Sequence, residues 1–262
     1  MEAGYVDGVI EIIQRLASAP DAPSAVELLH EAKRAIGADQ ALFVSFVRGD
    51  DASESFRFLL ACDPRWCLEY QQQGRFSQHP WLLYAARNSA PARASDIARP
   101  RNTQQGQDAL EARFAVASAC IVPAHPATGS SRLGVLGLTS PCPGYFDGAG
   151  FSIFKVVARA LARGLHEWWI RQIREEFVRT ARIVSEDLQL LRMQRQGLST
   201  KEIARQMRTK PAAIDSRFQR LISRMQVPNR KAAARVAADY GWIWSRGAPC
   251  FTPRGQCALS GL

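Results

Sequence analysis

Basic and polar side chains that could contact a nucleic acid gather in the last third of this sequence. Residues 171–246 hold 17 Lys and Arg against 7 Asp and Glu, a net charge of +10. Residues 1–170 hold 16 against 17, a net charge of −1. Each phosphate that a basic side chain neutralises releases counterions, so a basic segment beside a neutral one predicts contact with a phosphate backbone.

One short stretch of this basic segment offers side chains for two kinds of contact with a duplex. The residues that we expect to hold phosphates and fix the register are Lys210, Arg217, Arg220 and Arg224. The candidates for hydrogen bonds to base edges are Asp215, Ser216 and Gln219. This mixture predicts double-stranded DNA as a partner.

Two short helices are needed to position these side chains. The run LSTKEIARQM, residues 198–207, starts with a capping box in which Ser199 can accept from the Glu202 N–H and Glu202 can reach back. In the following RTKPA, Thr209 can cap a second helix and Pro211 can occupy its first turn. The apolar residues of that helix fall three and four positions apart and share one face: Ile214, Phe218, Leu221, Ile222 and Met225.

Such a pair of helices predicts a helix-turn-helix, with Ser199 and Thr209 among the residues at its interface with DNA. The alternative is an ordinary pair of core helices with solvated outer faces. The charge distribution favours the nucleic-acid interpretation.

The segment Ile183 to Ile243 resembles the DNA-binding domain of LuxR-type transcription regulators. The residues that carry the resemblance are Leu191, Gly197, Leu198, Ser199, Glu202, Ile203, Ala204, Ile214, Val227, Asn229, Arg230 and Ala233. The resemblance implies that the helix from about Pro211 to Met225 enters the major groove and that the helix after Asn229 makes a dimer contact. Asp187 stands where the family usually has Glu, and Arg208 where it often has Gly, which predicts a slightly altered turn.

The first 170 residues predict an α+β domain, an antiparallel sheet between layers of helices that can enclose a small molecule. Helical spacing or composition covers residues 6–16, 25–36, 63–74, 79–88 and 147–176. Strand-like runs cover residues 41–47, 56–61, 120–122 and 133–139, and turn-forming stretches join them into two hairpins. The whole chain thus predicts an α-β-α sandwich followed by an all-α helix-turn-helix domain.

This half resembles the autoinducer-binding domain of the same family, through Asp63 to Ile97, in which Trp66, Tyr70 and Pro80 match. For members that bind acyl-homoserine lactones, the resemblance implies that Trp66 donates its indole N–H to the lactone carbonyl and that Tyr70 lines the amide and acyl region. The alternative is two core aromatics four residues apart on one helix face.

Three residues depart from the family pattern at the ligand site. His79 stands where the family has an Asp that accepts from the ligand amide, Ala94 replaces a second Trp, and Ala119 stands where Gly is usual. A neutral imidazole has one acceptor nitrogen, whereas a carboxylate offers two charged oxygens. The space left by Ala94 could be refilled by Trp81, Tyr84 or Phe76. The domain therefore either accepts a different small molecule or folds without one.

The expected organisation is a ligand-binding domain over 1–170, a linker over 171–182, a helix-turn-helix domain over 183–245 and a loose tail over 246–262. No apolar run approaches the roughly 20 residues of a membrane span, and the acidic start MEAGYVDGVIEII is no signal peptide, so we expect a cytosolic protein. The cysteines show no C-x-x-C pair and no His at ligand spacing, so neither zinc nor a disulfide framework is indicated: Cys62, Cys67, Cys120, Cys142, Cys250 and Cys257.

We expect a small-molecule signal, an acyl-homoserine lactone or a related compound, to favour folding and dimerisation, and the dimer to bind a pseudo-palindromic operator. The helix 147–176 and the helix after Asn229 are the expected dimer surfaces. An enzyme is the first rival class, but the sequence has no G-x-S-x-G elbow, P-loop or H-E-x-x-H, and its only histidines are His30, His79, His125 and His166. A phosphorylation-controlled regulator is the second, and the hairpin pattern disfavours it because receiver domains alternate strands and helices.

Overall fold

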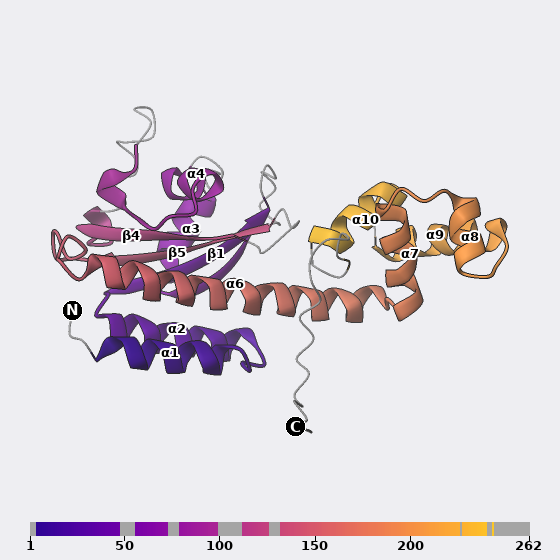
Figure 1. Ribbon diagram of the computed structural model, residues 1–262. Helices are drawn as coiled ribbons and strands as arrows, with labels where there is room; N and C mark the ends of the chain where they lie inside the picture. Colours follow the sequence, from indigo (N-terminus) through magenta and orange to yellow (C-terminus); the bar gives the residue numbers. More distant parts are fainter. Residues whose placement is uncertain are drawn as a thin grey trace, which may run out of the picture. The chain divides into compact units, whose positions relative to one another are not determined.

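The computed structural model describes residues 4–47, 56–72, 79–98, 112–125, 132–225, 227–239 and 243. It divides into two compact units, Met1–Arg182 and Ile183–Leu262, which we call unit 1 and unit 2 (Figure 1). The residues expected to form the tail, 246–262, lie outside the described ranges, as do Phe76 and the turn at 49–53.

Unit 1 is built on an antiparallel sheet whose described strands have the order β2-β1-β5-β4-β3. Their bounds are β1 Gln40–Val47, β2 Arg57–Ala61, β3 Ala92–Arg93, β4 Ser118–Ala124 and β5 Arg132–Ser140. The predicted pairs β1–β2 and β4–β5 are confirmed, and β1 pairs with β5 from Gln40 opposite Thr139 to Val47 opposite Arg132. Strand β3 was not predicted, because two residues are too few to show an alternation.

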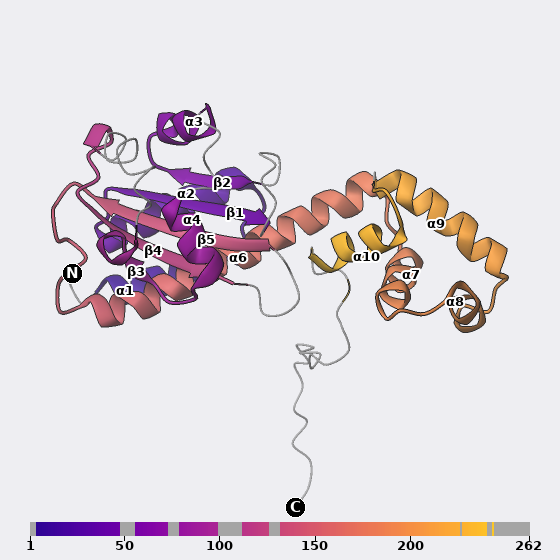
Figure 2. The ribbon, with the colours of Figure 1, turned by 90° about the horizontal axis from the view of Figure 1, so that it is seen from above.

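Three helices cover one face of the sheet: α1 Tyr5–Leu16, α2 Ala22–Ile36 and α6 Phe151–Ala181 (Figures 1 and 2). Helix α2 starts where the Asp21 carboxylate accepts from the Ser24 N–H, and it ends at Gly37, whose φ of 75° is the left-handed conformation that suits glycine. Buried residues of these helices, such as Leu29 and Leu165, form one core with Phe43 and Leu136 of the sheet. This core packs against β1 and against β5, the central strand of the sheet.

The other face of the sheet carries α3 Pro64–Gln72, α4 Pro80–Arg87 and the short 3-10 helix η3 Ala94–Asp96. In Figure 1, α4 lies above the strands, on the side opposite to α1 and α2. A second core joins Trp66 and Trp81 to Val44, Ile121 and Val135 of the sheet. The predicted α-β-α sandwich is therefore confirmed.

The segment 171–182, expected as a linker, continues helix α6 as far as Ala181. The sequence there has no Gly or Pro to end a helix. Both terminal nitrogens of Arg171 donate to carbonyls after α1, those of Ala17 and Ala19, and Gln172 donates to the Pro20 carbonyl at 3.3 Å. These contacts hold the first part of the segment against unit 1.

Unit 2 consists, within the described residues, of α7 Ser185–Arg195, α8 Thr200–Gln206, α9 Pro211–Met225 and α10 Arg230–Asp239. Its buried residues come from all four helices and include Leu191, Ile203, Phe218 and Ala237. The predicted all-α helix-turn-helix domain is confirmed. None of the helices in the described ranges is long and apolar enough to cross a bilayer.

Candidate nucleic-acid interface and ligand site

The predicted capping box starts α8. Ser199 Oγ accepts from the Glu202 N–H at 3.4 Å, and the Glu202 carboxylate accepts from the Ser199 N–H at 2.7 Å. Hydrogen bonds from Ser199 lower the pKa of Glu202, so the carboxylate stays charged near the helix N-terminus. The first helix of the motif therefore has a well-fixed start.

The turn between α8 and α9 depends on Arg208. Its φ of 52° lies in the left-handed region, so Arg208 takes the backbone conformation that favours glycine. Helix α9 begins at Pro211, and the residue directly before it is Lys210, not Thr209 as predicted. The Lys210 carbonyl accepts from the N–H groups of Ala213 and Ile214 in the first turn. The Thr209 N–H instead donates to the Ala204 carbonyl at 2.9 Å and closes α8.

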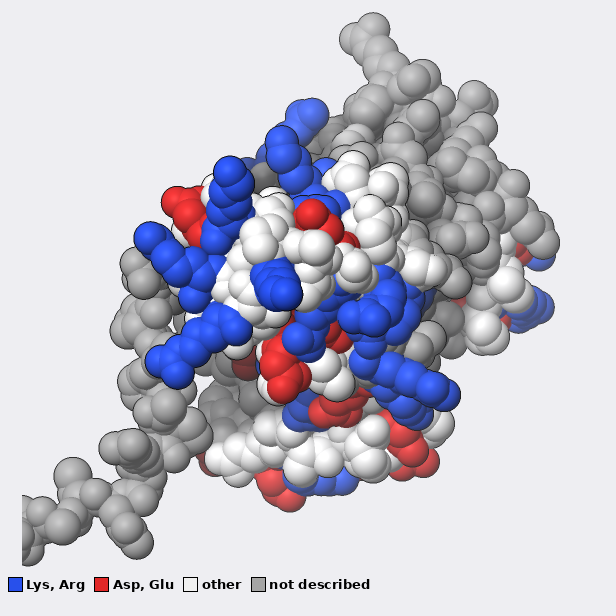
Figure 3. Space-filling model, turned by 90° about the vertical axis from the view of Figure 1, so that its right-hand side faces the viewer, with Lys and Arg blue, Asp and Glu red and all other residues white. Residues whose placement is uncertain are grey.

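Helix α9 separates apolar and polar residues as predicted. Ile214, Phe218, Leu221 and Met225 are buried, whereas Ile222 is half-buried. The exposed residues include Lys210, Asp215, Ser216, Gln219 and Arg220. Figure 3 views the molecule from the side where α8 and α9 lie and shows Lys and Arg side chains over much of this face, with fewer Asp and Glu among them. Five of the predicted DNA-binding residues are thus open to a partner.

Two further predicted phosphate contacts, Arg217 and Arg224, are engaged inside unit 2. The Asp187 carboxylate, 2% exposed, accepts from Arg217 Nε at 3.0 Å and from Arg224 Nη2 at 2.6 Å. Burial raises the pKa of Asp187, but the hydrogen bonds from Arg224, Arg217 and the Val184 N–H outweigh it and lower the pKa overall. Asp187 thereby fastens α9 to the start of α7.

A second polar contact holds α10 against α8 and α9. Arg230 donates to Asp215 at 2.8 Å and to the Thr200 hydroxyl at 3.1 Å. The predicted cap of α10 is confirmed, since Asn229 Oδ1 accepts from the Ala232 N–H at 2.9 Å. Asp215, although exposed, is therefore paired with Arg230. Gly241, expected just after this helix, lies outside the described residues.

In unit 1, an aromatic cluster of Trp66, Trp81, Phe114 and His79 lies between the sheet and α3 and α4. The Trp66 ring stacks on Phe114 with centroids 5.8 Å apart and meets Trp81 edge-on at 6.0 Å. His79 meets Trp81 edge-on at 5.0 Å. The structure thus brings three predicted ligand residues, Trp66, Trp81 and His79, together in one cluster.

Trp66 carries a buried polar atom that has no partner among the described residues. The residue is 3% exposed, and its indole Nε1 makes no hydrogen bond to any of them. A buried indole N–H usually finds an acceptor, because leaving it unmade costs free energy. Trp66 can therefore donate to a carbonyl of a molecule bound beside it.

His79, by contrast, uses a ring nitrogen within the protein. Its Nδ1 accepts from the Trp81 N–H at 3.1 Å and caps α4. In the neutral ring Nδ1 is then the unprotonated nitrogen, so Nε2 carries the hydrogen and can only donate. The remaining ring nitrogen of His79 consequently cannot accept from an amide N–H, as the carboxylate of an Asp at this position would.

Two of the three other predicted ligand residues, Ala94 and Ala119, line one small crevice. Its volume is about 150 Å³, and its walls include Arg93, Ser118 and Asp147. Both alanines are buried and belong to the core that contains the aromatic cluster. Tyr70 lies in α3, but its side chain is outside what the structure describes.

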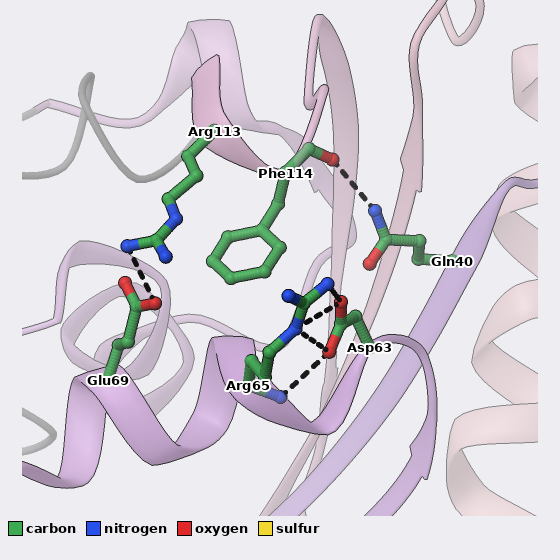
Figure 4. A network of polar contacts seen from close by, with 6 residues as sticks. All are labelled: Gln40, Asp63, Arg65, Glu69, Arg113 and Phe114. Carbon is green, nitrogen blue, oxygen red and sulfur yellow. Dashed lines mark hydrogen bonds and ion pairs between the residues drawn. The ribbon is translucent and has the colours of Figure 1, made fainter.

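Polar contacts hold α3 over the sheet (Figure 4). Glu69 of α3 pairs with Arg113 at 2.8 Å, and the carbonyl of the neighbouring Phe114 accepts from Gln40 Nε2 of β1 at 2.9 Å. Asp63 and Arg65 pair at 2.5 Å at the start of α3. This network places Phe114 against Trp66. Neither Gln40 nor Phe114 was predicted, because these contacts join residues distant in sequence, but a polar Gln at the start of an apolar strand was a visible signal.

Comparisons with known proteins agree with both units. Residues 185–237 match the model of the luxR family of bacterial regulatory proteins. Unit 2 therefore contains a luxR-family helix-turn-helix domain, which covers α7 to α9 and most of α10. No curated protein matches the sequence.

Solved structures share the fold of this chain at low sequence identity. SdiA in complex with octanoyl-rac-glycerol is 12% identical, with a TM-score of 0.68, over 94% of this chain and 100% of that one. SdiA from Escherichia coli in another crystal is 14% identical, with a TM-score of 0.68, over 90% and 98% of the two chains. CepR2 from Burkholderia cenocepacia, an N-acylhomoserine lactone dependent LuxR family transcription factor, is 18% identical, with a TM-score of 0.54, over 66% and 99%. The two-unit fold is thus that of SdiA.

Proposed function

We propose that this chain is a transcription regulator in which unit 2 binds operator DNA and unit 1 binds a small acyl signal molecule. The match of residues 185–237 to the luxR family carries the first half of the proposal. The buried Trp66 Nε1, which has no acceptor in the described residues, carries the second half.

In unit 2, the exposed side of α9 would enter the major groove. Ser216 and Gln219 are exposed and can hydrogen-bond to base edges, as can Asp215 together with Arg230. Lys210 and Arg220 form no ion pair with any described residue, so their charges are available for phosphates. We infer that Arg217 and Arg224 act mainly through Asp187 by positioning α9, and that phosphate contacts fall on Lys210 and Arg220.

In unit 1, the aromatic cluster would enclose the apolar part of the signal, and Trp66 would donate to its carbonyl. SdiA binds octanoyl-rac-glycerol and CepR2 depends on an N-acylhomoserine lactone, so this fold accommodates acyl compounds with different head groups. A ligand that binds only the folded unit stabilises it by RT ln(1 + [L]/Kd), about 2.7 kcal/mol at a hundredfold excess over Kd.

A signal other than an unmodified acyl-homoserine lactone is the second candidate, and His79 favours it. His79 Nδ1 already accepts from the Trp81 N–H, so it does not supply the acceptor that a ligand amide N–H needs. A regulator that needs no signal at all would also retain α9 and its exposed residues, so DNA binding alone does not separate these cases.

Homodimerisation is part of the proposal, with α6 and α10 as the contact surfaces. Helix α6 leaves Ile153 63% exposed and Val156 68% exposed, three residues apart on one helix face. Burial of such side chains against a second copy stabilises a dimer. A two-fold dimer would place two α9 helices about one helical turn apart on a pseudo-palindromic site.

Binding of the full chain to duplex DNA at several salt concentrations tests the assignment of the DNA-binding surface. Arg220→Ala should weaken binding at every sequence and reduce the slope of log K against log salt by about 0.9, since one phosphate contact is lost. Arg34→Ala, which removes an exposed arginine from unit 1, serves as the control and should leave the slope unchanged. An unchanged slope in Arg220→Ala would contradict the assignment of α9.

A further inference from the structure

Gln40 and Thr139 form a buried polar pair on the sheet of unit 1. They lie directly opposite each other at one end of the β1–β5 ladder. Gln40 is 9% exposed and Thr139 is 1% exposed. Buried polar side chains are normally hydrogen-bonded, so we examined the hydrogen-bond partners of both residues.

The register places the pair on the face that carries the aromatic cluster. Side chains alternate between the two faces of a strand, so Gln40 shares its face with Leu42 and Val44. By the same alternation Thr139 shares its face with Val135. Val44 and Val135 belong to the core that contains the aromatic cluster, and Leu42 packs against it.

Each residue of the pair keeps one side-chain oxygen that has no partner in the described part of the chain. Gln40 Nε2 donates to the Phe114 carbonyl at 2.9 Å, and a carbonyl can only accept, so this contact fixes the amide orientation (Figure 4). Gln40 Oε1 and Thr139 Oγ1 are both buried, and neither makes a hydrogen bond to any described residue. The Gln40 oxygen can only accept a hydrogen bond, whereas the Thr139 hydroxyl can donate or accept one.

We propose that Gln40 and Thr139 form a polar subsite that takes a hydroxyl group of the bound small molecule. A hydroxyl donates one hydrogen bond, which suits Gln40 Oε1, and accepts others, which suits the Thr139 O–H. The inference rests on the proposed function, since it assumes that a small molecule occupies this side of unit 1. It narrows the ligand to an acyl compound that carries a hydroxyl as well as a carbonyl.

Phe114 connects this subsite to Trp66. Its carbonyl holds Gln40, and its ring stacks on Trp66, whose N–H can meet only an acceptor. The chain therefore offers a donor for a carbonyl at Trp66 and a hydroxyl-matching pair at Gln40 and Thr139, with aromatic surface between them. Ala119, a small residue, lies opposite Thr139 on β4.

A matched pair of ligands tests the subsite by calorimetric titration of the full-length protein. The probes are N-octanoyl-homoserine lactone and its 3-hydroxyoctanoyl analogue, which differ by one hydroxyl. We expect the hydroxylated probe to bind about 3- to 10-fold more tightly, the factor of one net hydrogen bond. Thr139→Val, which removes the hydroxyl at similar size, should abolish this preference, and Thr139→Ser, which keeps the hydroxyl, should retain it.

The outcomes separate the subsite from the proposed function. If both probes bind the wild type and Thr139→Val does not change their ratio, the subsite is refuted while a ligand site in unit 1 stands. If neither probe binds, the acyl-lactone form of the proposed function fails and the inference fails with it.

A ligand-free measurement gives a second test of Thr139. The thermal midpoint of ligand-free Thr139→Val should be no lower than that of the wild type, because the hydroxyl has no hydrogen-bond partner among the described residues. A clear drop in the midpoint would show that Thr139 is satisfied within the fold and would overturn the subsite.

Discussion

Replacing Asp187 by Asn tests how α9 is held in place. Asn keeps the shape of the side chain but removes the charge that accepts from Arg217 at 3.0 Å and from Arg224 at 2.6 Å. Removal of one partner of a buried ion pair costs about 3 to 5 kcal/mol. The two guanidinium groups are 29% and 35% exposed and can be rehydrated, so we expect a smaller loss of about 2 kcal/mol.

Amide hydrogen exchange in the full chain, read on peptides from α7 and α9, measures this loss locally. A loss of about 2 kcal/mol corresponds to about 30-fold faster exchange through local opening. Asp215→Asn is the matched control, because Asp215 pairs with Arg230 but is 51% exposed, and we expect less than about a fivefold change there. Equal exchange in wild type and Asp187→Asn would refute the positioning role of Asp187.

The pH dependence of the same exchange adds an independent check. Because the pKa of Asp187 is lowered in the folded state, its stabilisation is present above the pKa of an unfolded carboxyl, about 3.9, and is lost as pH falls below it. Exchange in α9 of the wild type should therefore rise towards that of the variant in acid. A constant ratio between the two proteins down to low pH would contradict this linkage.

Two further predictions concern single residues in unfavourable environments, Arg208 with a positive φ and the buried His166. Arg208→Gly should raise the unfolding free energy of unit 2 by about 0.5 to 1 kcal/mol, because Gly accepts φ 52° without strain, and an unchanged or lower thermal midpoint would contradict this. Burial lowers the pKa of His166 to about 4, with help from the charges of Arg163, Arg132 and His125, so unit 1 should lose about 3 kcal/mol of stability as pH falls from about 6.5 to about 4. His166→Leu should flatten that dependence in denaturant titrations, and an unaltered profile would show that another group titrates.

Local patterns in the sequence predicted most elements, because their causes lie within a few residues. The capping box at Ser199 and Glu202 and the cap at Asn229 are confirmed by hydrogen bonds between residues three apart. Contacts between residues distant in the chain could not be predicted from local patterns. The packing of α6 on unit 1 at Arg171, which reaches the carbonyls of Ala17 and Ala19, is one such contact, and no local pattern reveals it.

The candidate sites likewise contain residues that local patterns predicted and contacts that only the fold reveals. The exposed side of α9 follows from helical periodicity, so Ser216, Gln219 and Arg220 could be named from the sequence. The engagement of Arg217 with Asp187, 30 residues apart, could not be predicted, because it depends on how α7 packs on α9. The pairing of Gln40 with Thr139 likewise required the register of two strands 99 residues apart in the chain.

The thermal unfolding midpoint of the full chain, with and without a panel of acyl-homoserine lactones of different chain length and octanoyl-rac-glycerol, tests the central claim most directly. We predict a dose-dependent rise with at least one compound, about 5 to 10 °C at a hundredfold excess over Kd, and no rise in Trp66→Phe, which keeps an aromatic ring but lacks the N–H. A protein that binds DNA but shows no rise with any compound would contradict the proposal that unit 1 senses an acyl signal.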